Sequence, residues 1–288
     1  MKGIILAGGK GSRLFPTTLG ASKQLLAIYD KPLLYYPLSV LLQASIQEIL
    51  IISTPNDIVS YQDLLGDGSQ LGISITYATQ PEPNGIAEAF IIGQDFLAND
   101  SVCLILGDNI FIGDNFSGKF PSPKDNFSGA KVFGYQVSDP ERFGVISNIE
   151  GKIMIEEKPK KPKSSYAVTG LYFYDKNVVE IARSLKPSKR GELEITDVNI
   201  AYLKNDQLDV VFLDEGFSWF DAGTHDSMIQ AGNYVQTIQN RQATVISCPE
   251  AIAYKNGWIG RKEVLEMAEK YNNHYGDYLQ KIANHQKS

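Results

Sequence analysis

The first part of the chain alternates short apolar runs with longer segments in which apolar residues recur every three or four positions. Short apolar runs predict buried strands, and recurrence at that spacing predicts helices. The predicted strands are residues 4–7, 49–53, 73–77 and 102–106, and the helices between them include 35–44 and 85–97. This order predicts an α/β fold with a Rossmann-like, mixed but mainly parallel sheet flanked by helices.

The pattern changes from about residue 130. Strands are predicted at 131–137, 143–147, 152–157 and 167–174, with turns between them, and we interpret residues 130–175 as a β-rich insertion that pairs partly antiparallel and covers the ligand-binding end of the sheet. Helices at 177–185, 197–204 and 225–240 and a strand at 208–213 complete a predicted core of residues 1–245. Residues 246–288, with helical patterns at 261–270 and 275–283, predict a C-terminal helical appendage.

Composition narrows the class of protein. Of the 288 residues, 43% are hydrophobic and 21% are charged, which is typical of a chain with a substantial core. The net charge of −6 argues against nucleic-acid binding, since phosphate backbones are bound by accumulated positive charge. The apolar run at 4–7 is too short for a membrane span or a signal-peptide core, so we expect no membrane partner. The two isolated cysteines, Cys103 and Cys248, favour a cytoplasmic location.

The most informative motif is a glycine-rich loop directly after the first predicted strand, formed by Gly8, Gly9, Gly11, Ser12 and Arg13. Glycines let backbone N–H groups approach anionic oxygens, and the arginine side chain can bind two such oxygens at once. The loop therefore predicts a polyphosphate site, although a strand and glycine turn without any ligand has the same pattern. The spacing matches neither a Walker A loop nor a dinucleotide-binding fingerprint.

Two aspartates are candidate ligands for a metal ion. Asp108 follows the predicted strand at 102–106, and Asp221 lies between a predicted strand and a predicted helix. Mg²⁺ usually takes one or two carboxylates and completes its octahedron with phosphate oxygens and water. The pair therefore predicts a Mg²⁺ site beside the polyphosphate, while a turn residue and a helix-capping residue are the alternative interpretations.

Three further polar residues could contact a nucleotide. Lys23 and Lys158 could neutralise phosphate, although lysines are more often solvated surface residues. Gln80 could hydrogen-bond the edge of a nucleobase, and Gly85 would leave room for a planar ring, although polar residues are also common in loops.

Several motifs together resemble the sugar nucleotidyltransferase family, and within it the glucose-1-phosphate thymidylyltransferases. The similarity extends over nearly the whole chain. It rests on the glycine loop, 22–24, 51–55, 62–69, 80–85, 107–109, 139–144, 157–159, 166–175, 190–197 and 221–225. The chain departs from the usual family pattern at Lys10, Phe15 and Ala222, none of which is a proposed ligand.

The resemblance implies transfer of a thymidylyl group from dTTP to α-D-glucose 1-phosphate, which gives dTDP-glucose and pyrophosphate. This reaction is the first step of dTDP-L-rhamnose biosynthesis. The family pattern implies Mg²⁺ as cofactor, a homotetramer, and feedback by dTDP-L-rhamnose at a second site to which the C-terminal helices contribute. The alternatives are a UTP-dependent or other-sugar nucleotidyltransferase and a catalytically silent nucleotide-sugar sensor.

The resemblance also implies a role for each matching residue. Asp108 and Asp221 would bind the metal and, with Arg13 and Lys158, would be catalytic in a direct in-line displacement. The nucleotide would contact Gly8, Gly9, Gly11, Ser12, Arg13, Lys23, Gln24, Gln80 and Gly85. The sugar phosphate would contact Asp108, Asn109, Gly144, Glu157, Lys158 and Val168.

Overall fold

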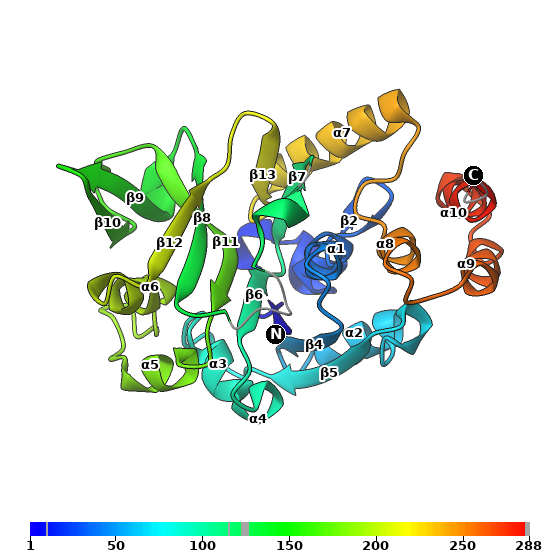
Figure 1. The fold of residues 1–288 in the computed structure, drawn as a ribbon. Helices are drawn as coiled ribbons and strands as arrows, with labels where there is room; N and C mark the ends of the chain where they lie inside the picture. Colours follow the sequence, from blue (N-terminus) through cyan, green and yellow to red (C-terminus); the bar gives the residue numbers. More distant parts are fainter. Residues whose placement is uncertain (10, 115, 122–126, 286–288) are drawn as a thin grey trace.

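The computed structural model describes residues 1–9, 11–114, 116–121 and 127–285, so Lys10 lies outside the described residues. A nine-stranded mixed sheet forms the centre of the molecule (Figure 1), with the strand order β10-β9-β11-β6-β1-β4-β5. Strand β8 pairs with β11, and β12 pairs with β8. The predicted α/β class with a mixed sheet is therefore confirmed.

The parallel half of the sheet corresponds to the first predicted strands. Strands β1 (Lys2–Leu6), β4 (Glu48–Ser53), β5 (Ser74–Thr79) and β6 (Val102–Leu106) pair in parallel, with β1 between β4 and β6. Helices α1 (Tyr35–Gln43), α2 (Ile58–Leu65), α3 (Glu88–Ile92) and α4 (Gln94–Leu97) connect these strands. The carboxyl ends of β1 and β6 lie side by side, which brings the glycine loop next to Asp108.

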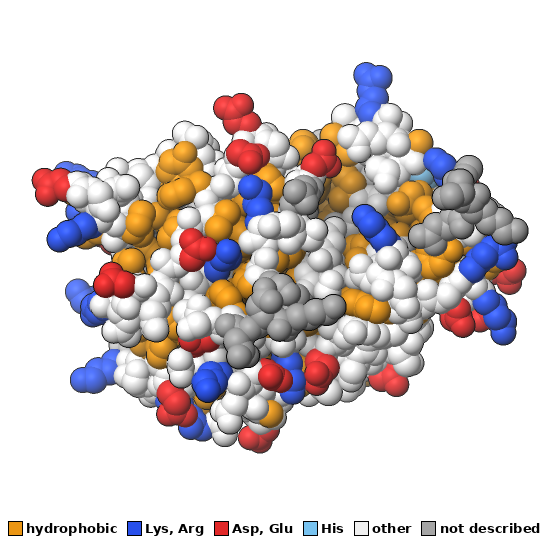
Figure 2. All heavy atoms as spheres, viewed as in Figure 1, with side chains coloured by type: hydrophobic (Ala, Val, Ile, Leu, Met, Phe, Trp, Pro, Cys, Tyr) orange, Lys and Arg blue, Asp and Glu red, His pale blue; other side chains and the backbone are white. Residues whose placement is uncertain are grey.

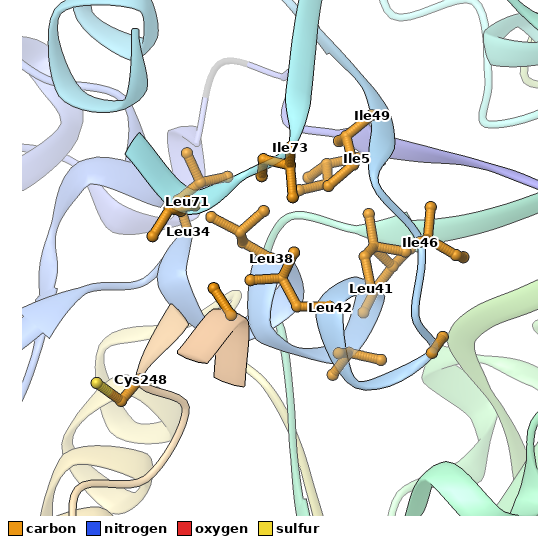
Figure 3. Packing of buried hydrophobic residues seen from close by; sticks show 14 of the residues in the cluster. Ile5, Leu34, Leu38, Leu41, Leu42, Ile46, Ile49, Leu71, Ile73 and Cys248 are labelled. Carbon is orange, nitrogen blue, oxygen red and sulfur yellow. The ribbon is translucent and has the colours of Figure 1, made fainter. Parts of the chain in front are cut away.

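Helix α1 packs its apolar side chains against this parallel half. Leu38, Leu41 and Leu42 lie near Ile5 and Ile49 in one buried cluster (Figure 3), and all five are fully buried. Burial of each such side chain stabilises the fold by about 1.5–3 kcal/mol relative to exposure. The parallel strands that carry the glycine loop and Asp108 are thereby held in a rigid framework.

The single helix predicted at 85–97 is two short helices, α3 and α4, which Gly93 separates. A Cβ atom at Gly93 would lie 3.0 Å from the carbonyl oxygen of Ala89 and 3.1 Å from side-chain atoms of both Ile4 and Leu50. The break therefore occurs where the backbone lies close to side chains of β1 and β4, which apolar periodicity alone does not reveal.

The antiparallel half of the sheet contains β8 (Ala130–Gln136), β9 (Gly144–Ile149), β10 (Lys152–Glu157) and β11 (Tyr166–Tyr174). Strand β11 pairs antiparallel with β6, β8 and β9, as expected for the β-rich segment. These strands extend the main sheet sideways, whereas we expected the segment to cover the end of the sheet. The reason is that β11 continues the hydrogen bonding of the central strand β6.

The structure also contains a separate two-stranded sheet. Strands β7 (Asn109–Gly113) and β13 (Phe217–Asp221) pair antiparallel, and a short hairpin joins β2 (Ala27–Ile28) to β3 (Lys31–Pro32). Chain segments far apart in sequence therefore meet at β7 and β13.

Helices α5 (Val178–Ser184) and α6 (Ile195–Lys204) precede β12 (Leu208–Phe212), which pairs in parallel with β8.

The C-terminal part of the chain is helical, as predicted. It contains α7 (His225–Gln242), α8 (Pro249–Lys255), α9 (Arg261–Ala268) and α10 (His274–His285), and α8 packs on α1 (Figure 1). Helix α8 was not predicted, because its few residues are too short a window for a periodic pattern. Within the described ranges, no helix combines the length and apolarity needed to cross a lipid bilayer.

Candidate active site

A cavity of about 320 Å³ lies between the parallel strands and the antiparallel half of the sheet. All six residues predicted to contact the sugar phosphate line it, together with Arg13 and Asp221. The polar side chains around it are Arg13, Asp108, Asn109, Arg142, Glu157, Lys158, Tyr172, Thr196, Trp219 and Asp221. Figure 2 shows one outer face of the molecule, on which acidic and basic side chains are interspersed among apolar ones.

Asp108 lies immediately beyond β6 and is paired with a lysine. Its carboxylate forms an ion pair with Lys23 and accepts a hydrogen bond from Asn109 Nδ2 at 2.9 Å. The Lys23 and Asp108 side chains are only 12% and 16% exposed. Burial by itself would raise the pKa of the Asp108 carboxyl, but the Lys23 ammonium and the hydrogen bonds hold that pKa below its usual value. Asp108 is therefore an anion at neutral pH.

Asp221 lies next to Asp108 because of the pairing between β13 and β7. In that register Asp221 is opposite Asn109, and the backbone N–H of Ala222 donates to the Asp108 carbonyl oxygen at 2.9 Å. Burial, and then the nearby Asp108 charge, raises the pKa of Asp221 to about 6. Arg142 Nη2 lies 3.3 Å from Asp221 Oδ2 and partly offsets this effect.

Arg13 reaches the same place from the glycine loop. A Cβ atom at Gly223 would lie 2.8 Å from Arg13 Nη2 and 3.1 Å from Asp221 Oδ1, so the guanidinium and the carboxylate flank this glycine. In the loop itself, Gly9 and Gly11 have φ values of 99° and 57°, a left-handed conformation that favours glycine. The loop thus turns sharply enough to bring Arg13 back over the end of β6.

The two aspartates fit a divalent cation. Each carboxylate is mostly buried, and the pKa of Asp221 is raised by that burial and then by the charge of Asp108; a bound cation would offset both effects. Two carboxylates with remaining positions for phosphate oxygens and water match the preference of Mg²⁺. The described residues contain no cluster of three or more His, Cys, Asp or Glu side chains suited to a metal, so these two carboxylates would need ligands from the substrate.

Glu157 and Lys158 line the same cavity where β10 ends. Glu157 Oε2 accepts a hydrogen bond from Thr196 Oγ1 at 2.5 Å, and Glu157 Oε1 lies 3.4 Å from both Lys158 Nζ and Arg190 Nη2. A Cβ atom at Gly144 would lie 3.1 Å from Thr196 Oγ1 and 3.5 Å from Glu157 Oε2. This part of the lining therefore combines an anionic acceptor with cations, which suits a ligand with both hydroxyl and phosphate groups.

Asn109 forms several hydrogen bonds within the lining of the cavity. It is 2% exposed, and its Oδ1 accepts hydrogen bonds from the Gly170 backbone N–H at 3.0 Å and from Trp219 Nε1 at 2.7 Å. Its Nδ2 donates to Asp108. Asn109 therefore lines the cavity, but its amide is already engaged in hydrogen bonds with Asp108, Gly170 and Trp219.

A second, smaller cavity of about 180 Å³ lies beside the glycine loop. Gly8, Gly9, Gln80 and Gly85 line it, and Ile86 lines both this cavity and the larger one. The predicted nucleoside-binding residues Gln80 and Gly85 therefore lie next to the loop predicted to bind phosphate.

The remaining residues predicted to bind nucleotide line neither of these two cavities. They are Gly11, Ser12, Lys23 and Gln24. Lys23 is paired with Asp108, and Gln24 is buried, with its Oε1 accepting from Ser22 Oγ at 2.8 Å and from the Tyr61 hydroxyl at 3.1 Å. Lys23 and Gln24 therefore lie beneath the site in this structure.

Sequence reasoning missed several side chains that the fold brings to the site. Arg142, Thr196 and Trp219 line the larger cavity, and Arg190 pairs with Glu157. The segments 139–144 and 190–197 carried part of the family resemblance, and that was the available signal for Arg142, Arg190 and Thr196. No role was assigned to them because isolated arginines and threonines are common on surfaces.

Comparison with known proteins assigns the family. Residues 2–238 match the family model described as nucleotidyl transferase. The chain is 55% identical to the glucose-1-phosphate thymidylyltransferase of Neisseria meningitidis, over 98% of this chain and 99% of that protein. It is 52% identical to the protein of the same name from Xanthomonas campestris, over 98% of this chain and 97% of that protein.

A solved structure agrees with these matches. It is that of a Bacillus anthracis protein assigned as a glucose-1-phosphate thymidylyltransferase and solved in complex with sucrose. That structure has a TM-score of 0.75 and 47% sequence identity, and the match covers 81% of this chain and 94% of that one. The resemblance inferred from the motifs is confirmed, and the chain is an enzyme that belongs to the nucleotidyltransferase family.

Proposed function

We propose that this enzyme transfers a thymidylyl group from dTTP to α-D-glucose 1-phosphate and releases pyrophosphate. The observation that carries the proposal is a pair of adjoining cavities that share Ile86, the larger of which Asp108 and Asp221 line. The smaller cavity, beside the glycine loop, suits a nucleotide, and the larger one, which Glu157 and Lys158 line, suits a sugar phosphate. The relatives that carry the name of this activity support the same substrates.

The reaction brings two polyanions together, so alignment and charge neutralisation are the main tasks of the protein. A phosphate oxygen of the sugar phosphate attacks the α-phosphorus of dTTP. A new P–O bond forms as the bond between the α-phosphorus and the bridging oxygen breaks, and pyrophosphate leaves with that electron pair. Mg²⁺ held by Asp108 and Asp221 would supply positive charge for the phosphate oxygens.

The side chains of the protein supply the remaining contacts in this proposal. Arg13 stabilises the departing pyrophosphate with its two-pronged guanidinium, and Lys158 orients the attacking phosphate. Glu157 accepts hydrogen bonds from sugar hydroxyls, while Lys23 keeps Asp108 ionised and assists on the nucleotide side. No protein nucleophile is needed, because the displacement is direct.

Pyrophosphate release tests the proposal. Purified protein with Mg²⁺ should release pyrophosphate only when both dTTP and glucose 1-phosphate are present, and dTDP-glucose should form in equal amount. A panel with UTP and with other sugar 1-phosphates addresses the alternative substrates, because one methyl group is worth only about 1–3 kcal/mol in a pocket. Binding of nucleotide sugar without turnover would instead support a silent sensor.

The feedback site is proposed at a further cavity of about 530 Å³, where residues of β7, α7, α8 and α10 meet. Lys255 lines it and could pair with the diphosphate of dTDP-L-rhamnose. Lys255→Ala should relieve inhibition by dTDP-L-rhamnose without changing the KM for dTTP. The homotetramer and the cytoplasmic location stay predictions, and light scattering of the purified protein tests the first.

A further inference from the structure

Gln80, the residue predicted to read the nucleobase, is held by a neighbouring carboxylate. Gln80 Nε2 donates to Glu88 Oε2 at 2.6 Å and to the Gly85 carbonyl oxygen at 3.1 Å. Gln80 is 7% exposed, so its amide has little freedom to find other partners. Glu88 begins α3 and is itself fixed, since Asn84 Nδ2 donates to its Oε1 at 3.0 Å.

These contacts decide which way round the Gln80 amide lies. A carboxylate and a backbone carbonyl can only accept hydrogen bonds, so both must face the NH₂ group of the amide. The Oε1 atom then points the other way, and a Cβ atom at Gly8 would lie 3.3 Å from it. Gln80 therefore presents a hydrogen-bond acceptor toward the small cavity that Gly8 and Gly85 line.

An acceptor fixed in this position distinguishes nucleobases. Thymine and uracil have an N–H donor at ring position 3, whereas cytosine has a bare acceptor nitrogen there. Two acceptors that face each other in a mostly buried site leave both groups without a partner, which is costly. If the amide could turn over, its NH₂ group would meet cytosine equally well, so discrimination depends on what prevents the turn.

We propose that Glu88 is a positioning residue that locks the Gln80 amide with its oxygen toward the base, so that the enzyme selects thymine or uracil nucleotides over cytosine nucleotides. This inference rests on the proposed function only in that the base occupies the small cavity. Glu88 touches neither substrate in this scheme, because it acts through Gln80.

The test measures equilibrium binding of dTTP and dCTP, and then kcat/KM for both, in the wild-type protein, Glu88→Gln and Glu88→Ala. A glutamine at position 88 can offer either an oxygen or an NH₂ group, so only the longer hydrogen bond to the Gly85 carbonyl oxygen still opposes rotation of the Gln80 amide. We expect each variant to lower the dTTP-to-dCTP ratio of affinities by about tenfold, which corresponds to about 1.4 kcal/mol. Glu82→Gln, an exposed change in the same loop, is the matched control and should leave the ratio unchanged.

The outcomes separate the two proposals. If the dTTP-to-dCTP ratio of affinities stays within twofold of wild type in both variants, even where both affinities fall equally, Glu88 only stabilises the turn and the inference is wrong. If the ratio shifts but no pyrophosphate is released with glucose 1-phosphate, the inference stands and the proposed reaction fails. If neither nucleotide binds the wild-type protein, both proposals fail.

Discussion

The ion pair between Lys23 and Asp108 offers a sharp test of the electrostatics of the site. In Lys23→Met the aliphatic part of the side chain is kept and the ammonium is lost, so the carboxylate of Asp108 remains 16% exposed beside Asp221 without its main partner. Removing one member of a buried ion pair costs about 3–5 kcal/mol, and with this residual exposure we expect a loss of about 2–4 kcal/mol in the free energy of unfolding.

A double-mutant cycle isolates this effect from the general cost of mutation. The free energies of unfolding of wild type, Lys23→Met, Asp108→Asn and the double variant are measured in urea without divalent cations. Asp108→Asn removes the unpaired charge, so the double variant should recover most of the loss, with a coupling energy of about 2 kcal/mol. Lys131→Met is the control, since its partner Asp209 is 61% exposed and the expected loss is below about 1 kcal/mol.

Two results would refute this reasoning. A coupling energy under about 0.5 kcal/mol would mean that solvent already compensates Asp108. If Lys131→Met lowers the free energy of unfolding as much as Lys23→Met does, burial of the Lys23–Asp108 pair does not increase the contribution of that pair to stability. Addition of Mg²⁺ should also restore part of the stability of Lys23→Met, because the cation would replace the missing positive charge.

Three further predictions concern activity and packing. Arg13→Ala should lower kcat by about two to four orders of magnitude if the guanidinium acts mainly in the transition state, and steady-state kinetics that show a change in KM alone would contradict that role. Asp221→Asn should weaken the dependence of the reaction rate on Mg²⁺. Divalent cations are removed with a chelator, and the rates of variant and wild type are then measured as Mg²⁺ is added back; equal titration curves would exclude Asp221 as a metal ligand. Gly170→Ala should destabilise the protein by about 1–3 kcal/mol, because the new Cβ would lie 2.5–2.8 Å from the Asn109 side-chain amide; thermal melting checks this, and an unchanged melting temperature would show that Asn109 can move away.

The sequence supported the parallel strands and the residues that follow them. The runs at 4–7 and 102–106 are apolar over their whole length because strands β1 and β6 are buried on both faces, and this pattern is visible without a structure. Because β1 and β6 pair in parallel, the glycine loop and Asp108 must both lie at the carboxyl ends of the strands. The boundaries of the helices leave no such pattern: at Gly93, which lies close to Ile4 and Leu50, the structure interrupts a predicted helix.

Long-range contacts were beyond the reach of sequence patterns. The pairing of Arg142 with Asp221 and of Arg190 with Glu157 involves charged side chains, which have no periodic signature. The residue pattern predicted Asp221 as a metal ligand, but its raised pKa follows from burial and from the neighbouring Asp108 charge. Such effects exist only once the side chains are brought together.

The sequence by itself determined the class of fold, the glycine loop at the end of the first strand and the position of Asp108, because strand burial and glycine conformation leave local traces in the residue order. The tertiary structure decided which carboxylates face each other, which cations pair with them and how the Gln80 amide is oriented. Those features depend on the antiparallel pairing of β7 with β13 and on the start of α3, and they arise from distances between residues that are remote along the chain or separated by a turn.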